Sequence, residues 1–149
     1  MLRISKLADY GTVIMNCLAN DPEITHKCHE IAHKVHLALP TTSKILKMLV
    51  SADLVSSVRG SGGGYRLSRP SEHITVAEII TALDGQPALT ECTAIAKKCP
   101  HEGICGVRDN WHLINKVVFL ALNSLTLADM MKPINLHPTI VQGIQFEQR

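Results

Sequence analysis

Long apolar runs are missing from this sequence. The longest, VVFLAL at residues 117–122, is far shorter than the roughly 18 apolar residues that a membrane span needs. The first residues, MLRISKLADYG, also lack the basic-then-apolar pattern of a secretory signal. We therefore expect a cytoplasmic protein with no membrane partner.

Catalytic residue sets are missing as well. No Ser/His/Asp arrangement and no pair of carboxylates stands out, so we expect no enzymatic activity. The glycine-rich stretch RGSGGG at 59–64 could suggest a nucleotide phosphate loop. That interpretation fails because no helix is expected to begin after the glycines and no GK[ST] follows them.

A strong net charge is also absent, and the charge that exists is uneven. Residues 1–70 carry nine Lys/Arg against five Asp/Glu, giving +4, whereas residues 71–149 carry six against eight, giving −2. This basic front half is a weak signal for a polyanionic partner. Apolar residues make up 46% of the 149 residues, which is enough for one folded domain with an additional element.

The first half of the sequence predicts a helix-turn-helix. A helix is expected over about residues 5–18, and a second begins after Asp21-Pro22 with Thr25 as its N-cap. A third helix follows in LALPTTSKILKML. The histidines between residues 26 and 36 are expected to form a solvated or DNA-facing surface. The start of the third helix would face the major groove through Pro40, Thr41, Thr42, Ser43, Lys44 and Lys47.

A short hairpin directly after these helices predicts a wing. LVSSV (54–58) and YRLSRP (65–70) are strand-like, and the glycines between them permit a tight turn and a close approach to another surface. A plain structural hairpin is the alternative. In a winged helix this hairpin would contact DNA through Arg59, Ser61, Gly62, Gly63 and Tyr65.

The second half predicts a long helix on a separate element. A capping box at Thr75–Glu78 starts a helix that Gly85 ends, and a helix over about 106–125 is apolar nearly all round. Such a helix is buried from two sides, by its own domain and by a partner, so we expect a homodimer. A second capping box, Thr126 to Asp129, starts a short helix.

The fold class expected from these patterns is mainly α with a small β wing: a winged helix-turn-helix plus a long C-terminal dimerisation helix. The expected divisions are a DNA-binding domain (1–84), a cysteine loop (85–105), a dimerisation helix with a short helix (106–131), and an irregular tail (132–149).

Three of the five cysteines, Cys92, Cys99 and Cys105, fall within CTAIAKKCPHEGIC. Clustered cysteines in a reducing compartment more often bind a metal or act in redox chemistry than form disulfides. Gaps of six and five residues fit an iron–sulfur cluster better than structural zinc, whose ligands usually pair about two to four residues apart. His101 could nevertheless complete a Cys3His zinc site, and free thiols are a third possibility. Cys17 and Cys28 are expected to be buried hydrophobes.

Residues 1–131 resemble a known family. LVSSVRGSGGGYRLSRP, ITVAEIITALDG and the three close cysteines are similar to the iron–sulfur winged-helix transcription regulators of the IscR and NsrR type. The resemblance implies a homodimer on a double-stranded DNA operator. It also implies a [2Fe-2S] or [4Fe-4S] cluster on the three cysteines.

Two positions depart from IscR. Arg108 stands where IscR has a ligating histidine, and Ser43 stands where it has an acidic residue. The histidine ligand and the operator preference therefore do not carry over. The cysteine spacing is closer to the NsrR nitric-oxide sensors and to the SUF-system regulators, and the latter group is favoured.

The resemblance also implies a fourth ligand. Asp9 in LADYG matches the aspartate that NsrR-type proteins supply across the dimer, with His101, Glu102 and His112 of the same subunit as alternatives. We expect a cluster-sensing regulator of iron–sulfur cluster assembly genes. A nitric-oxide-sensing repressor, a zinc-stabilised DNA-binding protein and an electron-transfer protein are the alternatives; the last would not need a basic wing.

Overall fold

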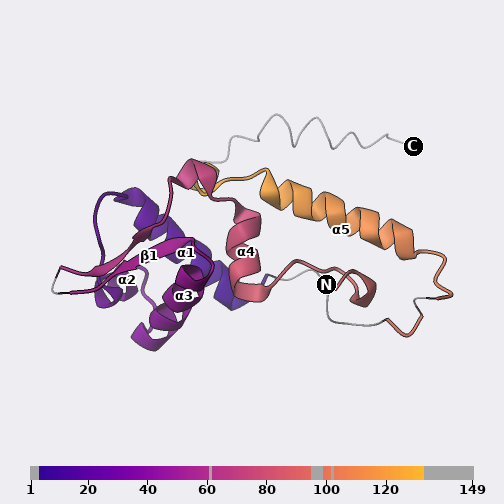
Figure 1. The fold of residues 1–149 in the computed structure, drawn as a ribbon, viewed down its shortest axis with the longest axis horizontal. Helices are drawn as coiled ribbons and strands as arrows, with labels where there is room; N and C mark the ends of the chain where they lie inside the picture. The colour runs from indigo at the N-terminus through magenta and orange to yellow at the C-terminus, as the bar shows by residue number, and fades with distance from the viewer. Residues whose placement is uncertain (1–3, 61, 95–98, 102, 133–149) are drawn as a thin grey trace.

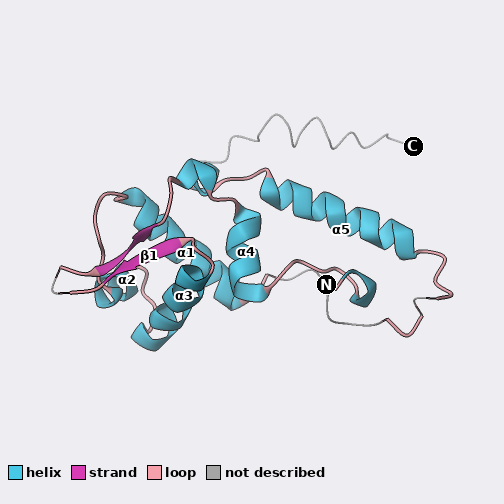
Figure 2. Ribbon diagram, viewed as in Figure 1, coloured by secondary structure: helices cyan, strands magenta, loops and turns pink. Residues whose placement is uncertain are grey.

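The computed structural model describes residues 4–60, 62–94, 99–101 and 103–132. It is mainly helical with one two-stranded sheet (Figure 2), which confirms the predicted fold class. No described helix is long and apolar enough to cross a membrane. In chain order (Figure 1) the elements are α1 (Lys6–Asn20), α2 (Cys28–Lys34), α3 (Leu39–Ser51), β1 (Val55–Val58), β2 (Gly64–Leu67), the 3-10 turn η1 (Ser71–His73), α4 (Val76–Asp84), the 3-10 turn η2 (Glu91–Thr93), α5 (Arg108–Asn123) and α6 (Leu127–Met130).

The core lies between α1, α3 and α4. Apolar residues spaced three and four apart put one face of each helix inward, and α6 closes the core with Leu127. Helices α1 and α4 approach closely at Gly11, where an added Cβ would lie 2.0 Å from Leu83 Cδ1. The fully buried side chains include Ile14, Met15, Leu18, Ile31, Ile45, Leu46, Leu49, Ile74, Ile79 and Leu127.

Local signals at helix ends are confirmed for α4 and α6. Thr75 and Glu78 form the capping box that starts α4, and Gly85 follows its end with a φ of 83°. Thr126 and Asp129 form the equivalent box before α6. These ends agree because each depends on residues within one turn of chain.

The predicted start of α2 is wrong. Its N-cap is Lys27 rather than Thr25, and the carboxylate of Glu30 accepts a hydrogen bond from the Lys27 N–H at 2.9 Å. The preceding residue, His26, pairs with the wing. Its N–H donates to the Tyr65 carbonyl at 2.9 Å, and the Tyr65 N–H donates to the His26 carbonyl at 2.8 Å. Residue 26 is thus paired with a strand and cannot belong to a helix.

This pairing also buries His26. Its side chain is only 4% exposed, so the prediction of a histidine surface is wrong for this residue, whereas His29, His33 and His36 are exposed. The backbone at His26 and the strand β2 lie very close at Gly64, since a Cβ on Gly64 would lie 2.3 Å from the His26 carbonyl oxygen. The wing is therefore attached to the helix-turn-helix by backbone hydrogen bonds.

The cysteine segment (residues 85–105) begins after α4 and ends before α5, and its turn η2 lies alongside that helix. Helix α5 extends away from the winged head, which comprises α1–α4, the wing and α6 (Figure 1). It packs against α4 and η2, yet none of its residues is buried. Its own domain covers one side of α5 only in part: Leu122 is half-buried and packs against the core. The predicted tail lies outside the described residues, apart from Lys132.

Candidate functional site

Of the six α3 residues predicted to read DNA, five are at least partly exposed. Pro40, Lys44 and Lys47 are exposed, and Thr41 and Ser43 are half-buried. Thr42 is different: it is 0% exposed, and its hydroxyl donates to the Ala38 carbonyl at 3.2 Å. Its side chain faces the core and cannot reach a base edge.

The wing presents Arg59 beyond the end of β1. Arg59 and Gly62 are exposed, and the Arg59 guanidinium makes no hydrogen bond or ion pair within the described part of the chain. Gly63 sits where a Cβ would lie 2.2 Å from the Val58 carbonyl oxygen, so the tip of the hairpin requires glycine there. Tyr65 is half-buried against the core. Ser61 lies outside the described residues.

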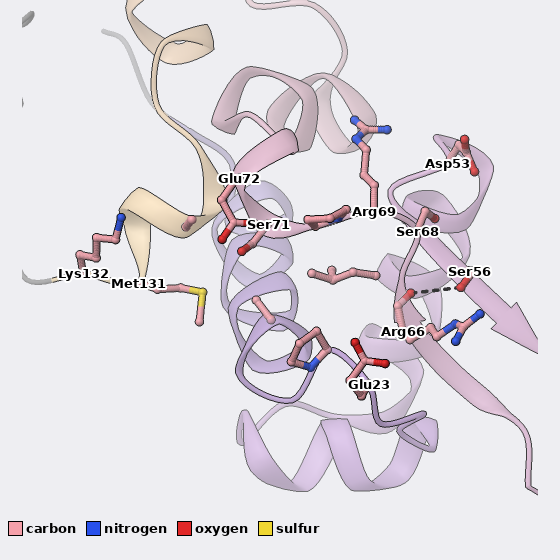
Figure 3. Close-up of a pocket in the computed structure, with 15 residues that line it drawn as sticks. Glu23, Asp53, Ser56, Arg66, Ser68, Arg69, Ser71, Glu72, Met131 and Lys132 are labelled. Atoms are coloured by element: carbon pink, nitrogen blue, oxygen red, sulfur yellow. Dashed lines mark hydrogen bonds between the residues drawn. The ribbon is translucent and has the colours of Figure 1, made fainter.

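A groove of about 800 Å³, lined by both polar and apolar side chains, lies between the base of the wing, η1 and α6 (Figure 3). Arg66 lines it, and the Ser56 hydroxyl donates to the Arg66 carbonyl at 3.5 Å. Its lining includes both acidic and basic side chains, and Arg69 in its wall forms an ion pair with Glu78. No predicted cluster ligand borders this groove, so it is separate from the cysteine segment.

The cysteine segment connects α4 to α5. All five cysteines are free thiols and half-buried. Cys92 lies in η2, where its Sγ is 3.1 Å from the Thr90 hydroxyl oxygen. Cys105 lies just before α5, and its carbonyl accepts a hydrogen bond from the Arg108 N–H at 3.4 Å. The segment thus places one thiol at each end of a loop.

The three thiols do not meet in the single chain. Within residues 4–60, 62–94, 99–101 and 103–132, no three His, Cys, Asp or Glu side chains gather as metal ligands. The donor chemistry still fits a soft metal centre, since thiolates favour zinc and iron–sulfur clusters. Lys97, Lys98 and Glu102 lie outside the described residues.

Asp9 lies on the exposed side of α1. It borders a groove of about 450 Å³ between α1, α4 and α6, together with Ser5, Val76 and Ile80. Its carboxylate forms no hydrogen bond or ion pair with a described residue. The alternatives His101 and His112 are also exposed. A carboxylate in this position is free to meet a second molecule.

The two remaining cysteines lie in the head. Burial raises the pKa of the Cys17 thiol, although Lys34 opposes this effect. Burial also raises the pKa of the Cys28 thiol, with Lys47 opposing it. Because the thiolate is the form that binds metals, these thiols are poorer ligands than ordinary cysteines.

Sequence reasoning missed Asn115, a half-buried residue of α5 that bonds the backbone of the cysteine segment. The one feature of the sequence that could have indicated Asn115 is its polar amide in the middle of an apolar helix.

Residues 4–133 match the Rrf2 family, which is described as an iron-dependent transcriptional regulator. The chain is 28% identical to the protein rrf2 of Nitratidesulfovibrio vulgaris over 138 residues, 92% of each chain. It is 32% identical to IscR of Photobacterium profundum over 106 residues, 71% of this chain and 61% of that one.

Solved structures are similar over most of the fold. CymR of B. subtilis, described as the global cysteine regulator, has a TM-score of 0.69 and 32% identity, covering 88% of this chain and 97% of its own. T. potens IscR has a TM-score of 0.67 and 29% identity, covering 99% and 94%.

Proposed function

The chain belongs to the Rrf2 family of DNA-binding transcription regulators, and from this premise we propose that it is a homodimer that senses an iron–sulfur cluster. The cluster would be held by Cys92, Cys99 and Cys105. Its targets would be genes of iron–sulfur cluster assembly of the SUF type.

The observation that carries the proposal is the set of three free thiols in one segment ahead of α5. Thiolates are the preferred ligands of iron–sulfur clusters. A cluster would supply a centre that responds to iron supply and to oxidants. The residues of the chain would hold it next to the helix that we expect to join the two subunits.

DNA binding is assigned to α3 and the wing. The exposed ammonium groups of Lys44 and Lys47 lie on the outward side of α3, and Arg59 lies on the hairpin. In winged helices of this kind the second helix of the motif enters the major groove. Cations that neutralise phosphates strengthen binding by releasing counterions.

Dimerisation is assigned to α5. Leu113, Val117 and Leu120 are 62%, 57% and 53% exposed, and their spacing puts them on one stripe of the helix. Water-exposed apolar stripes of this kind are usually covered by a partner. A second copy of α5 is the cover that we propose.

The fourth ligand is assigned to Asp9 of the second subunit. Two observations support this: the carboxylate is exposed and unpaired, and no ligand set forms within the described part of one chain. Asp9 lies on α1, so this bond would connect the DNA-binding head of one subunit to the cysteine segment of the other. A carboxylate is a weak ligand for cluster iron, and we expect it to dissociate first.

The function is tested by anaerobic purification followed by an absorption spectrum and counts of iron, sulfide and zinc. We expect iron and sulfide, with loss of both in Cys92→Ser and retention in Cys17→Ser, a thiol outside the segment. Operator affinity should differ between the loaded and metal-free dimers. Stoichiometric zinc without sulfide would contradict the proposal.

The ligand assignment has its own test. Asp9→Ala should still take up iron on three cysteines, with a changed spectrum and a shorter cluster lifetime, and its DNA affinity should no longer depend on cluster state. If Asp9→Ala behaves like the parent while His101→Ala changes all three properties, the ligand is His101 and the cross-subunit connection is wrong.

A further inference from the structure

The side chain of Asn115 joins α5 to the beginning of the cysteine segment. Its Oδ1 accepts a hydrogen bond from the Leu89 N–H at 3.0 Å, and its Nδ2 donates to the Pro87 carbonyl at 3.1 Å. A side-chain amide has both a donor and an acceptor, so it can bind both backbone groups at once. The two bonds fix the segment in position along the helix.

From Leu89 the chain leads directly into the turn η2, which holds Cys92. The Thr90 N–H donates to the Thr93 hydroxyl at 3.1 Å, and the Thr93 hydroxyl donates to the Thr90 carbonyl at 2.9 Å. These bonds close η2 around Cys92, whose Sγ contacts the Thr90 hydroxyl. Residues 87–93 therefore form one connected path from α5 to the first thiol.

The other end of the loop is attached to the same helix. Cys105 comes just before Arg108, the first residue of α5. At roughly 1.5 Å per residue, Asn115 lies about 10 Å further along the helix axis. The cysteine segment is thus attached to α5 at two points about two turns apart, through Asn115 near its beginning and through the chain itself at its end.

We propose that Asn115 is a positioning residue that sets the place of Cys92 relative to Cys105 for cluster binding. This inference rests on the proposed function of the cysteines. Asn115 contacts the cysteine segment, whereas Phe119 lines a groove with residues of α4 and Leu122 packs against the core. Loss of the Asn115 amide should therefore disturb the cysteine segment and leave the winged head intact.

The first experiment uses the metal-free full-length chain. Asn115→Ala should raise the amide hydrogen exchange of Leu89 by roughly fivefold, the change expected for one lost hydrogen bond, and residues 90–93 should follow. Asn115→Asp keeps the acceptor for Leu89 and should have a smaller effect there. Asn110→Ala, an exposed amide on the same helix, is the matched control. Equal exchange in Asn115→Ala and Asn110→Ala overturns the attachment.

The second experiment uses the cluster-loaded dimer. Asn115→Ala should lose iron to a chelator several-fold faster than the parent and should change the visible circular dichroism of the cluster. Its melting temperature without metal should match that of Asn110→Ala, which a purely structural role would not produce. Unchanged iron loss and spectrum overturn the positioning role. If the parent itself takes up no iron and sulfide, the proposed function fails, and the exchange measurement alone decides whether Asn115 positions Cys92.

Discussion

At the scale of residues, neighbouring side chains on α3 either pack in the core or face solvent. Thr42 shares the inward face with Ile45 and Leu46, so its hydroxyl is satisfied inside the head. Lys44 and Lys47 point outward. A helical period of about 3.6 residues separates the two groups, and only the outward group can contact DNA.

Arg59→Ala should weaken operator binding to all sequences by a similar factor. The Arg59 guanidinium is exposed and unpaired in the described chain, so it is available to a phosphate. Losing one such contact should reduce the slope of log affinity against log salt by about 1. Titration at several salt concentrations measures this, with Lys116→Ala on α5 as control. An unchanged slope and affinity would remove Arg59 from the interface.

Gly64→Ala should destabilise the head by about 1–3 kcal/mol, since overpacking a tight site has costs of this order. The new Cβ would meet the backbone carbonyl of His26 at 2.3 Å, and backbone cannot rotate away. Gly62→Ala is the control, because an added Cβ there has nothing within 4 Å. Urea unfolding of both variants gives the comparison. Equal stabilities would show that the backbone at His26 does not pack tightly against Gly64.

At the scale of elements, the starts of α4 and α6 support each other. The Val76 N–H donates to the Leu125 carbonyl at 2.9 Å and the Leu127 N–H donates to the Ile74 carbonyl at 2.8 Å. The two capping boxes therefore lie side by side. This pairing brings the chain back from α5 to the head and fixes the position at which α5 leaves the head.

Glu78→Gln should reduce stability at pH 7 but not at low pH. Burial raises the pKa of the Glu78 carboxyl, but hydrogen bonds from the Thr75 N–H and from Arg69 outweigh it and leave the pKa lowered. A lowered pKa stabilises the fold above the ordinary glutamate value of about 4.3. That contribution is lost as the pH falls through the lower, folded value.

The carboxylate is partly exposed, so we expect a difference below about 1 kcal/mol. Urea unfolding at pH 7 and again near pH 3 measures it. A parent–variant difference that stays constant between the two pH values would contradict the role of the Glu78 charge.

At the scale of the whole molecule, the chain is a compact head with an arm formed by α5 and the cysteine segment (Figure 1). The head buries its core within one chain. The arm leaves Leu113, Val117 and Leu120 in water. The head therefore has a core of its own, whereas the proposed dimer would cover the apolar stripe of the arm with a second copy of the chain.

Val117→Asp should convert the proposed dimer to a monomer at micromolar concentration. A charge without a partner in a buried seam is costly, whereas the head should keep its helical content. Sedimentation velocity and far-ultraviolet circular dichroism measure the two properties. Asn110→Asp introduces the same charge at an exposed site of α5 and should stay dimeric. If Val117→Asp also stays dimeric, the subunits associate through another surface.

The sequence by itself determined the elements whose signals are local. The Thr75–Glu78 box, the glycine after α4 and the apolar periods of the helices each act within a few residues, so the pattern is readable without the fold. The spacing of the cysteines likewise predicts a metal-binding segment, and this stays a prediction.

The tertiary structure decided features that depend on contacts between distant residues. His26 pairs with Tyr65 in the wing, which moves the start of α2 and buries a histidine that the sequence places on the surface. Asn115 reaches back to Pro87 and Leu89, a contact without any local pattern. The apolar period of a helix is the same whether its side chains pack against their own domain or face water. The exposure of the apolar side chains of α5 was therefore visible only in the tertiary structure.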